Sequence, residues 1–203
     1  MRYFPALTAG QIEKFEALKV LYEEWNARIN VISRKDMDNF YLHHVLHSLA
    51  LALPMEGMVL SGDRILDLGT GGGFPGIPLA IMFGQCSFVL CDSVRKKTLV
   101  ASEVAKVLKL ENVTVVNDRA ENLEGKFDYV VSRAVTSLDR MLPWIKGSYR
   151  SGVLYLKGGE IDDEIDRCIS RRLIDARKLS IIDICDFFKE DWFLEKKIVI
   201  IKR

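Results

Sequence analysis

Apolar residues near the start of the chain recur at every third or fourth position, which is the spacing of one helical face. Thr8 and Gln11 precede this run with the spacing of a capping box, in which each side chain satisfies a backbone amide of the other residue. We therefore predict a helix about 30 Å long, at ~1.5 Å per residue. Its apolar face consists of Ile12, Phe15, Leu18, Tyr22, Trp25 and Ile29.

A second helical stretch is indicated by Ser33 and Asp36, which have the spacing of another helix start. Apolar positions continue from there to Pro54, and a short connector follows at 57–62. We therefore predict that residues 1–60 form an N-terminal helical segment.

From Arg64 onward the pattern changes to short apolar runs of strand length, and helical patterns separate the earlier runs. This alternation predicts an α/β domain over residues 61–203, with a mostly parallel sheet and helices on both faces. The last two runs have no clear helix between them, which indicates an antiparallel hairpin at the sheet edge. The predicted strands are 65–68, 88–91, 113–116, 129–131, 153–156, 179–184 and 198–201, and the predicted helices are 93–110, 137–146 and 161–176.

Residues 64–78, which read RILDLGTGGGFPGIP, form the most informative stretch of the chain. An apolar run ends at Asp67, glycines crowd the next positions, and apolar residues then resume. Strand, glycine turn and helix start is the order that a nucleotide or phosphate site needs. A tight turn without a ligand is the alternative, and we disfavour it because so many glycines cost chain entropy.

Two coenzyme classes fit this turn. Gly71, Gly73 and Gly76 match GxGxxG, and Asp92 follows about 20 residues later, so a nicotinamide-dependent oxidoreductase is one hypothesis. Asp67 argues against it, because a carboxylate ~5 Å from a pyrophosphate charge costs ~3 kcal/mol at an effective dielectric of ~20. S-adenosylmethionine carries an ammonium and a sulfonium, which the same carboxylate suits. We therefore favour S-adenosylmethionine as the cofactor, bound by Asp67 and the glycine turn.

Other candidates follow the predicted strands, because ligands of such sheets bind at the carboxyl ends of the strands. Asp92 can accept both ribose hydroxyls of a nucleoside, and we favour this role over its alternative as a helix N-cap. Ala120 and Glu121 lie in a polar loop where a backbone amide and a carboxylate could meet an adenine ring. A solvated loop is the alternative for these two residues.

Arg133 and Lys157 are the candidate catalytic residues. Arg133 follows the fourth strand, where its planar guanidinium suits a cofactor carboxylate or an RNA phosphate, and its alternative is a surface arginine. Lys157 follows the fifth strand and could meet a phosphate as a point charge.

The composition sets limits on partners and location. The 203 residues have a formal net charge of +1, so the overall charge does not indicate nucleic-acid binding. No apolar run approaches ~18 residues and no signal peptide is visible, so we expect a cytoplasmic protein without membrane contact. We also expect a monomer. The four cysteines lack metal-site spacing and are expected to be reduced thiols. These residues are Cys86, Cys91, Cys168 and Cys185.

Missing motifs narrow the chemistry of a methyl transfer. No Asn/Asp-Pro-Pro-Tyr/Phe follows the fourth strand, which disfavours methylation of an exocyclic amine, and no cysteine follows a proline as the nucleophile for a pyrimidine carbon would. A ring nitrogen with a free lone pair, such as guanine N7, needs only positioning and electrostatics.

Three histidines lie close together in the second helical stretch. His43 and His47 could share a helix face, but His44 stands where a zinc-protease motif has glutamate. We therefore expect no metal here and interpret the histidines as a polar or RNA-facing cluster.

An ordered set of motifs resembles the glucose-inhibited division protein B family, the bacterial guanine-N7 methyltransferases of small-subunit (16S) ribosomal RNA. The match runs from about residue 20 to 160 and leaves the last ~40 residues with little signature. Its motifs are Trp25-Asn26 with Asn30, His44 with Ser48, DLGTGGGFPGIPLAI at 67–81, CDSVRKK at 91–97, LKLENV at 108–113, RAE at 119–121, SRA at 132–134 and LKGG at 156–159.

This resemblance implies a Rossmann-like class I methyltransferase fold with an N-terminal helical addition, and a target guanine in the decoding-region loop of 16S RNA. It also implies cofactor contacts at Gly69, Phe74, Ala120, Glu121 and Arg133. His47 departs from the family, which usually has aspartate at this position.

We therefore expect the chain to methylate guanine N7 of small-subunit ribosomal RNA, as free RNA or in a ribosomal particle. Two alternatives stay open, a nicotinamide-dependent oxidoreductase and a non-catalytic RNA-binding factor that keeps a vestigial pocket.

Overall fold

The computed structural model describes residues 2–203 and contains a seven-stranded sheet in the order β3-β2-β1-β4-β5-β7-β6. The five strands from β1 to β5 are parallel, and β7 runs antiparallel to both β5 and β6. The sequence prediction of a parallel sheet with an antiparallel edge hairpin is therefore confirmed. The strands are β1 (Arg64–Leu68), β2 (Ser87–Cys91), β3 (Val113–Val116), β4 (Phe127–Arg133), β5 (Tyr149–Gly158), β6 (Leu179–Asp183) and β7 (Lys196–Lys202).

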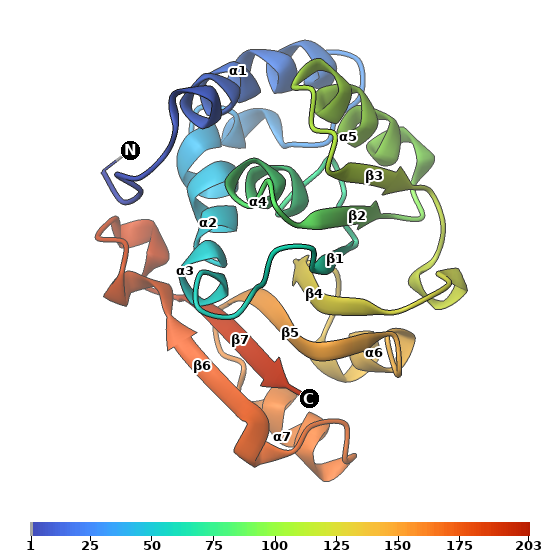
Figure 1. The fold of residues 1–203 in the computed structure, drawn as a ribbon. Coiled ribbons are helices and arrows are strands. Elements are labelled where there is room, and N and C mark those ends of the chain that lie inside the picture. Colours follow the sequence, from blue (N-terminus) through green and yellow to red (C-terminus); the bar gives the residue numbers. More distant parts are fainter. Residues whose placement is uncertain (1) are drawn as a thin grey trace.

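Helices cover both faces of this sheet (Figure 1). One core cluster joins the sheet to the N-terminal helices and to α4 (Gly76–Met82) and α5 (Arg95–Val107). The other joins it to α6 (Leu138–Trp144) and α7 (Asp162–Ser170). Because side chains alternate along a strand, the buried apolar side chains of the sheet divide between these two layers.

The first helix, α1 (Ala9–Asn26), begins as its sequence predicts but ends before Ile29, which the prediction placed on its apolar face. Thr8 and Gln11 make the reciprocal capping box, and Phe15, Leu18 and Tyr22 are buried. The side-chain amide nitrogen of Gln11 also donates to the last carbonyls of α4, and it lies 3.0 Å from the carbonyl oxygen of Ile81. The helical segment thus packs on the same core as the sheet.

The prediction of one helix from Ser33 to Pro54 is wrong. This stretch is broken into the 3₁₀ turn η1 (Arg34–Asp36), the π-helix η2 (Tyr41–Leu46), α2 (His47–Leu49) and α3 (Ala52–Met55). Ser33 makes no capping hydrogen bond. Asp36 instead binds the side chains of two histidines in η2, and this tertiary contact replaces a helix start.

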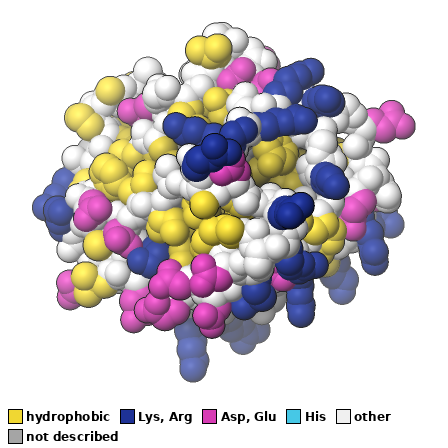
Figure 2. All heavy atoms as spheres, turned by 90° about the horizontal axis from the view of Figure 1, so that it is seen from below, with side chains coloured by type: hydrophobic (Ala, Val, Ile, Leu, Met, Phe, Trp, Pro, Cys, Tyr) yellow, Lys and Arg dark blue, Asp and Glu magenta, His cyan; other side chains and the backbone are white. Residues whose placement is uncertain are grey.

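The carboxyl-terminal hairpin closes the lower end of the molecule. Its two strands are joined by the 3₁₀ turns η5 (Ile184–Asp186) and η6 (Asp191–Phe193), and Tyr3 from the other end of the chain packs on Phe188 of this connection. Two further 3₁₀ turns are η3 (Ala120–Asn122) and η4 (Ala176–Lys178). Figure 2 shows this end from below, with a group of Asp and Glu side chains at the lower left and Lys and Arg side chains spread over other parts of the face.

None of the helices over residues 2–203 is both long and apolar enough to cross a membrane. Cys86, Cys91 and Cys168 are buried and Cys185 is half-buried, and all four are free thiols.

Candidate active site

A cavity of about 460 Å³ opens at the carboxyl ends of the parallel strands. This is the edge at which open α/β sheets bind ligands, and the volume lies within the range of small-molecule pockets. Its lining combines acidic, basic and apolar side chains from the ends of β1, β2 and β4, from the segment after β3 that leads into η3, from α5 and from α6. The lining residues are Leu68, Gly69, Cys91, Asp92, Ser93, Lys97, Asp118, Arg119, Ala120, Glu121, Ala134, Val135 and Trp144.

Of the residues that the sequence singles out, Gly69, Asp92, Ala120 and Glu121 line this cavity. Asp92 accepts from the backbone amides of Gly71 at 2.9 Å and Val94 at 2.8 Å. Since α5 begins at Arg95, the carboxylate of Asp92 is not its cap, and it links the glycine turn to the second strand. A carboxylate has about four acceptor sites, so both oxygens can still accept from a ligand.

Asp67 lies beneath the glycine turn and does not line the cavity. Its side chain is fully buried, and Oδ2 accepts from the amide of Gly76 at 2.7 Å. Burial raises the pKa of Asp67 to about 7, although the side chain of Thr70, the amide of Gly76 and the nearby Arg133 lower it. The carboxylate of Asp67 therefore fixes the first turn of α4.

The glycines of the turn have separate tasks. Gly69 has φ +67°, and a Cβ there would lie 2.2 Å from Val135, so this glycine permits close contact of the β1 and β4 ends. Gly73 has φ +112°, and the neighbouring carbonyl of Gly72 accepts from the hydroxyl of Tyr22 at 2.7 Å. Phe74 packs its ring on Tyr22, outside the cavity. The turn is thus tied to helix α1.

Arg133 is the last residue of β4, and it points away from the cavity, toward the N-terminal helices. Its guanidinium donates to the carbonyl of His43 at 3.0 Å and lies 3.2 Å from Nδ1 of His44. The guanidinium carbon also lies 5.2 Å from the ring centre of Phe74. Because Tyr129 and Val131 share its side of the strand, Arg133 belongs to the layer that holds α1 and α4.

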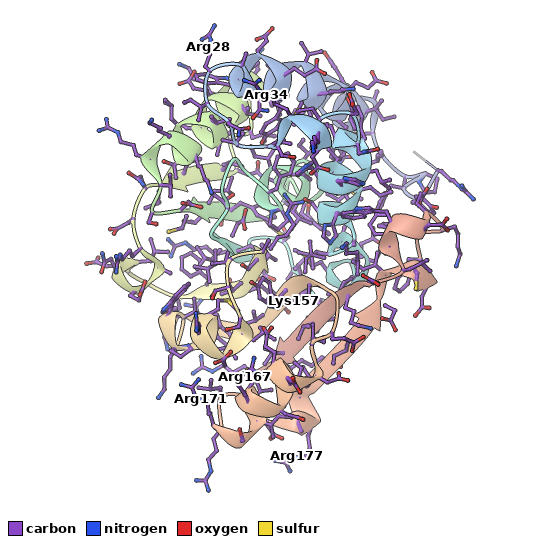
Figure 3. The ribbon with its side chains drawn as sticks, turned by 180° about the vertical axis from the view of Figure 1, so that it is seen from behind. Arg28, Arg34, Lys157, Arg167, Arg171 and Arg177 are labelled. Carbon is purple, nitrogen blue, oxygen red and sulfur yellow. The ribbon has the colours of Figure 1, made fainter. Side chains whose placement is uncertain are left out.

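Lys157 lies on the opposite layer. Its ammonium is 2.7 Å from Glu164 on α7 and donates to the carbonyl of Thr136 at 3.1 Å. The two predicted catalytic cations therefore face different sides of the sheet, and neither lines the cavity. Figure 3 places Lys157 near the middle of the molecule, Arg28 and Arg34 at one end, and Arg167, Arg171 and Arg177 toward the other.

The loop after β4 is held in an unusual conformation at the cavity. Ala134 has φ +53°, which costs a non-glycine residue about 1–2 kcal/mol. The hydroxyl of Tyr155 accepts hydrogen bonds from the backbone amides of Val135 and Thr136, and it donates one to the carbonyl of Thr136. Strain of this kind gathers at functional sites. Sequence reasoning missed the roles of Val135, Thr136 and Trp144, since no motif marks them.

The match to a family model covers residues 11–186, and that model, GidB, is described as rRNA small subunit methyltransferase G. Curated relatives called ribosomal RNA small subunit methyltransferase G are similar over nearly their whole length. The protein of Christiangramia forsetii is 48% identical, with 98% of this chain and 93% of the relative covered. The protein of Porphyromonas gingivalis is 47% identical, with 98% and 90% covered.

Solved structures of methyltransferases share the fold. Magnesium protoporphyrin IX methyltransferase from Synechocystis, solved with bound SAM, has a TM-score of 0.63 at 17% identity, with 98% of this chain and 99% of that chain covered. The ribosomal protein L11 methylase of Lactobacillus delbrueckii has a TM-score of 0.59 at 14% identity, with 78% and 79% covered.

Proposed function

Because the chain belongs to the rRNA small subunit methyltransferase G family, we propose that it transfers a methyl group from S-adenosylmethionine to guanine N7 in the decoding-region loop of 16S ribosomal RNA. The family match over residues 11–186 is the observation that carries this function. The oxidoreductase and the non-catalytic factor find no support among the relatives.

The cavity fits the cofactor. Its volume of about 460 Å³ suits a nucleoside with an amino-acid tail. The acidic side chains of Asp92 and Glu121 line it, and carboxylates can accept hydrogen bonds from ribose hydroxyls and from a base. Ala120 presents backbone next to them. When bound, S-adenosylmethionine supplies an electrophilic methyl group on a positively charged sulfur.

The protein then needs to hold the guanine in line and to exclude other orientations. N7 of guanine has a free lone pair, so no side chain has to remove a proton from it. The rate enhancement rests on orientation and electrostatics. This agrees with a cavity whose charged side chains are anchored by hydrogen bonds, such as Asp92 on the amides of Gly71 and Val94.

Arg133 is the side chain that we assign to the reacting end, although it does not itself line the cavity. It is the last residue of β4, and the next two residues, Ala134 and Val135, line the cavity. A guanidinium there suits a phosphate or the cofactor carboxylate. Lys157 supports the same end through the carbonyl of Thr136.

The test is transfer of labelled methyl to 16S RNA and to small subunits, followed by borohydride and aniline cleavage to locate the modified guanine. Cleavage at one guanine of the decoding region would support the proposal, and the two substrates separate free RNA from the ribosomal particle. Cofactor binding without transfer to either substrate would favour the non-catalytic factor. Binding of NAD without any response to S-adenosylmethionine would overturn the proposal.

A further inference from the structure

His44 connects Arg133 to a carboxylate of the N-terminal segment. Nδ1 of its ring lies 3.2 Å from a guanidinium nitrogen of Arg133, and Nε2 lies 2.6 Å from Oδ2 of Asp36. Arginine has donors only, so Nδ1 of His44 must accept. The single ring proton therefore sits on Nε2 and donates to Asp36, which makes the ring neutral and fixes its tautomer.

The surroundings of His44 hold the ring in this state. Its side chain is 12% exposed, and it stacks on Phe40 with an interplanar angle of 28°. Burial, with the charge of Arg133, lowers the pKa of His44 to about 4, while the hydrogen bond to Asp36 opposes the shift. A neutral imidazole that bridges a cation and a carboxylate is the arrangement that orients both partners.

The backbone around His44 is specialised for this contact. Residues Tyr41–Leu46 form a π-helix, a rare conformation that occurs frequently at functional sites. Two adjacent side chains, those of His43 and His44, reach the two oxygens of Asp36 from it. The hydroxyl of Ser48 donates to the carbonyl of His44 at 2.6 Å and closes the turn.

We propose that His44 is a positioning residue that holds the guanidinium of Arg133 for methyl transfer, with Asp36 fixing the ring from the other side. The inference rests on the proposed function, because it assumes that Arg133 serves the reacting end. The inference also gives the N-terminal segment a part in methyl transfer, because its side chains His44 and Asp36 position Arg133.

Two matched substitutions separate the two contacts of the ring. His44→Asn keeps an oxygen near the place of Nδ1, which can accept from Arg133. His44→Gln keeps an amide near the place of Nε2, which can bind Asp36. The guanidinium nitrogen of Arg133 that faces Nδ1 then has no acceptor on the ring, while the carbonyl of His43 still accepts from the other nitrogen. We expect kcat/KM for RNA to fall about tenfold or more in His44→Gln, corresponding to ~1.4 kcal/mol, and to fall less in His44→Asn.

A double-mutant cycle gives the decisive readout. If His44 acts through Arg133, then His44→Ala lowers transfer in the natural background and causes no further loss in the Arg133→Ala background. Equal, additive losses would overturn the inference and leave the proposed function standing. A wild-type rate in Arg133→Ala would instead overturn the role proposed for Arg133 and this inference with it.

The tautomer can be measured without any activity. Long-range ¹H–¹⁵N spectra of the whole protein labelled with ¹⁵N-histidine should show a neutral ring at His44 with its proton on Nε2 at pH 7. A charged ring, or a proton on Nδ1, would overturn the inference. Circular dichroism of each variant checks that it is folded.

Discussion

The carboxylate of Asp67 accepts a hydrogen bond from the amide of Gly76 at 2.7 Å, and this contact joins the end of β1 to the first residue of α4. The side chain of Thr70, in the turn above, lies beside the same carboxylate, and together with the amide of Gly76 it lowers the pKa of Asp67, but burial raises that pKa by more. The glycine turn is thus organised around a buried acid whose charged form is costly.

This burial makes stability depend on pH. A carboxyl whose pKa is raised by folding stabilises the protein below its ordinary pKa of 3.8, and this contribution is lost as the pH rises toward about 7. Asp67→Asn keeps an acceptor for Gly76 and cannot ionise. Between pH 4 and 7.5 we expect the free energy of unfolding of Asp67→Asn to gain roughly 2–4 kcal/mol relative to wild type, measured in urea, at ~1.4 kcal/mol per pKa unit. The exposed control Asp166→Asn should show no such trend, and parallel pH profiles for both variants would contradict the prediction.

Gly76 is required for space. A Cβ at this position would lie 2.5 Å from Oδ2 of Asp67 and 2.8 Å from Leu90. Gly76→Ala should therefore destabilise the protein by about 2 kcal/mol or more, because the packed turn cannot yield. Gly10→Ala is the matched control, since it lies in helix α1 with no atom within 4 Å of the new Cβ and should stabilise by up to ~1 kcal/mol. Thermal unfolding of both variants checks this, and equal shifts would refute it.

Ala134 carries backbone strain next to the cavity. Its φ of +53° suits glycine, so Ala134→Gly should leave stability unchanged or raise it, the relief of strain offsetting ~1 kcal/mol of added chain entropy. Ala134→Val should lower the free energy of unfolding by ~1 kcal/mol or more. Urea unfolding gives the free energy of unfolding of both variants. If the glycine variant is less stable than the valine variant, the positive φ of Ala134 is not a source of strain.

A double substitution with Glu164 distinguishes a catalytic role of Lys157 from a structural one. The half-buried carboxylate of Glu164 pairs with Lys157 and also accepts a hydrogen bond from the amide of Leu138. Lys157→Met alone leaves this carboxylate without its cation. We expect a loss of about 1–3 kcal/mol and reduced methyl transfer. In Lys157→Met with Glu164→Gln no charge is left unpaired, so stability should recover. If methyl transfer recovers together with stability in the double variant, Lys157 positions the loop after β4 through Thr136. If methyl transfer stays low, the catalytic role of Lys157 is supported.

Asp92 gives a direct test of the proposed cofactor site. Asp92→Ala removes the acceptor for the amides of Gly71 and Val94 together with the proposed ribose contact. We expect calorimetry to show binding of S-adenosylhomocysteine weakened at least ~10-fold, because charge-assisted hydrogen bonds contribute more than ~1.4 kcal/mol. The control Asp166→Ala should bind normally. Unchanged affinity in Asp92→Ala would place the ribose elsewhere.

Local pattern was sufficient to predict most of the architecture. The apolar runs located all seven strands, the Thr8 capping box located the first helix, and the run from Arg64 to Pro78 located the glycine turn. These features depend on residues near one another in the chain, whose periodicity and turn chemistry act locally. The family resemblance came from the same local motifs, and the match to the family model over residues 11–186 confirms it.

The tertiary structure alone decided which way the polar side chains face. Arg133 and Lys157 each lie at the carboxyl end of a strand of the same sheet, but alternation along the strands sends one to the N-terminal helices and the other to α7. Asp36 interrupts the predicted second helix because it binds two histidines that are seven and eight residues away. Contacts of this kind depend on which layer packs against which face, and that choice is made only when the whole chain buries its core.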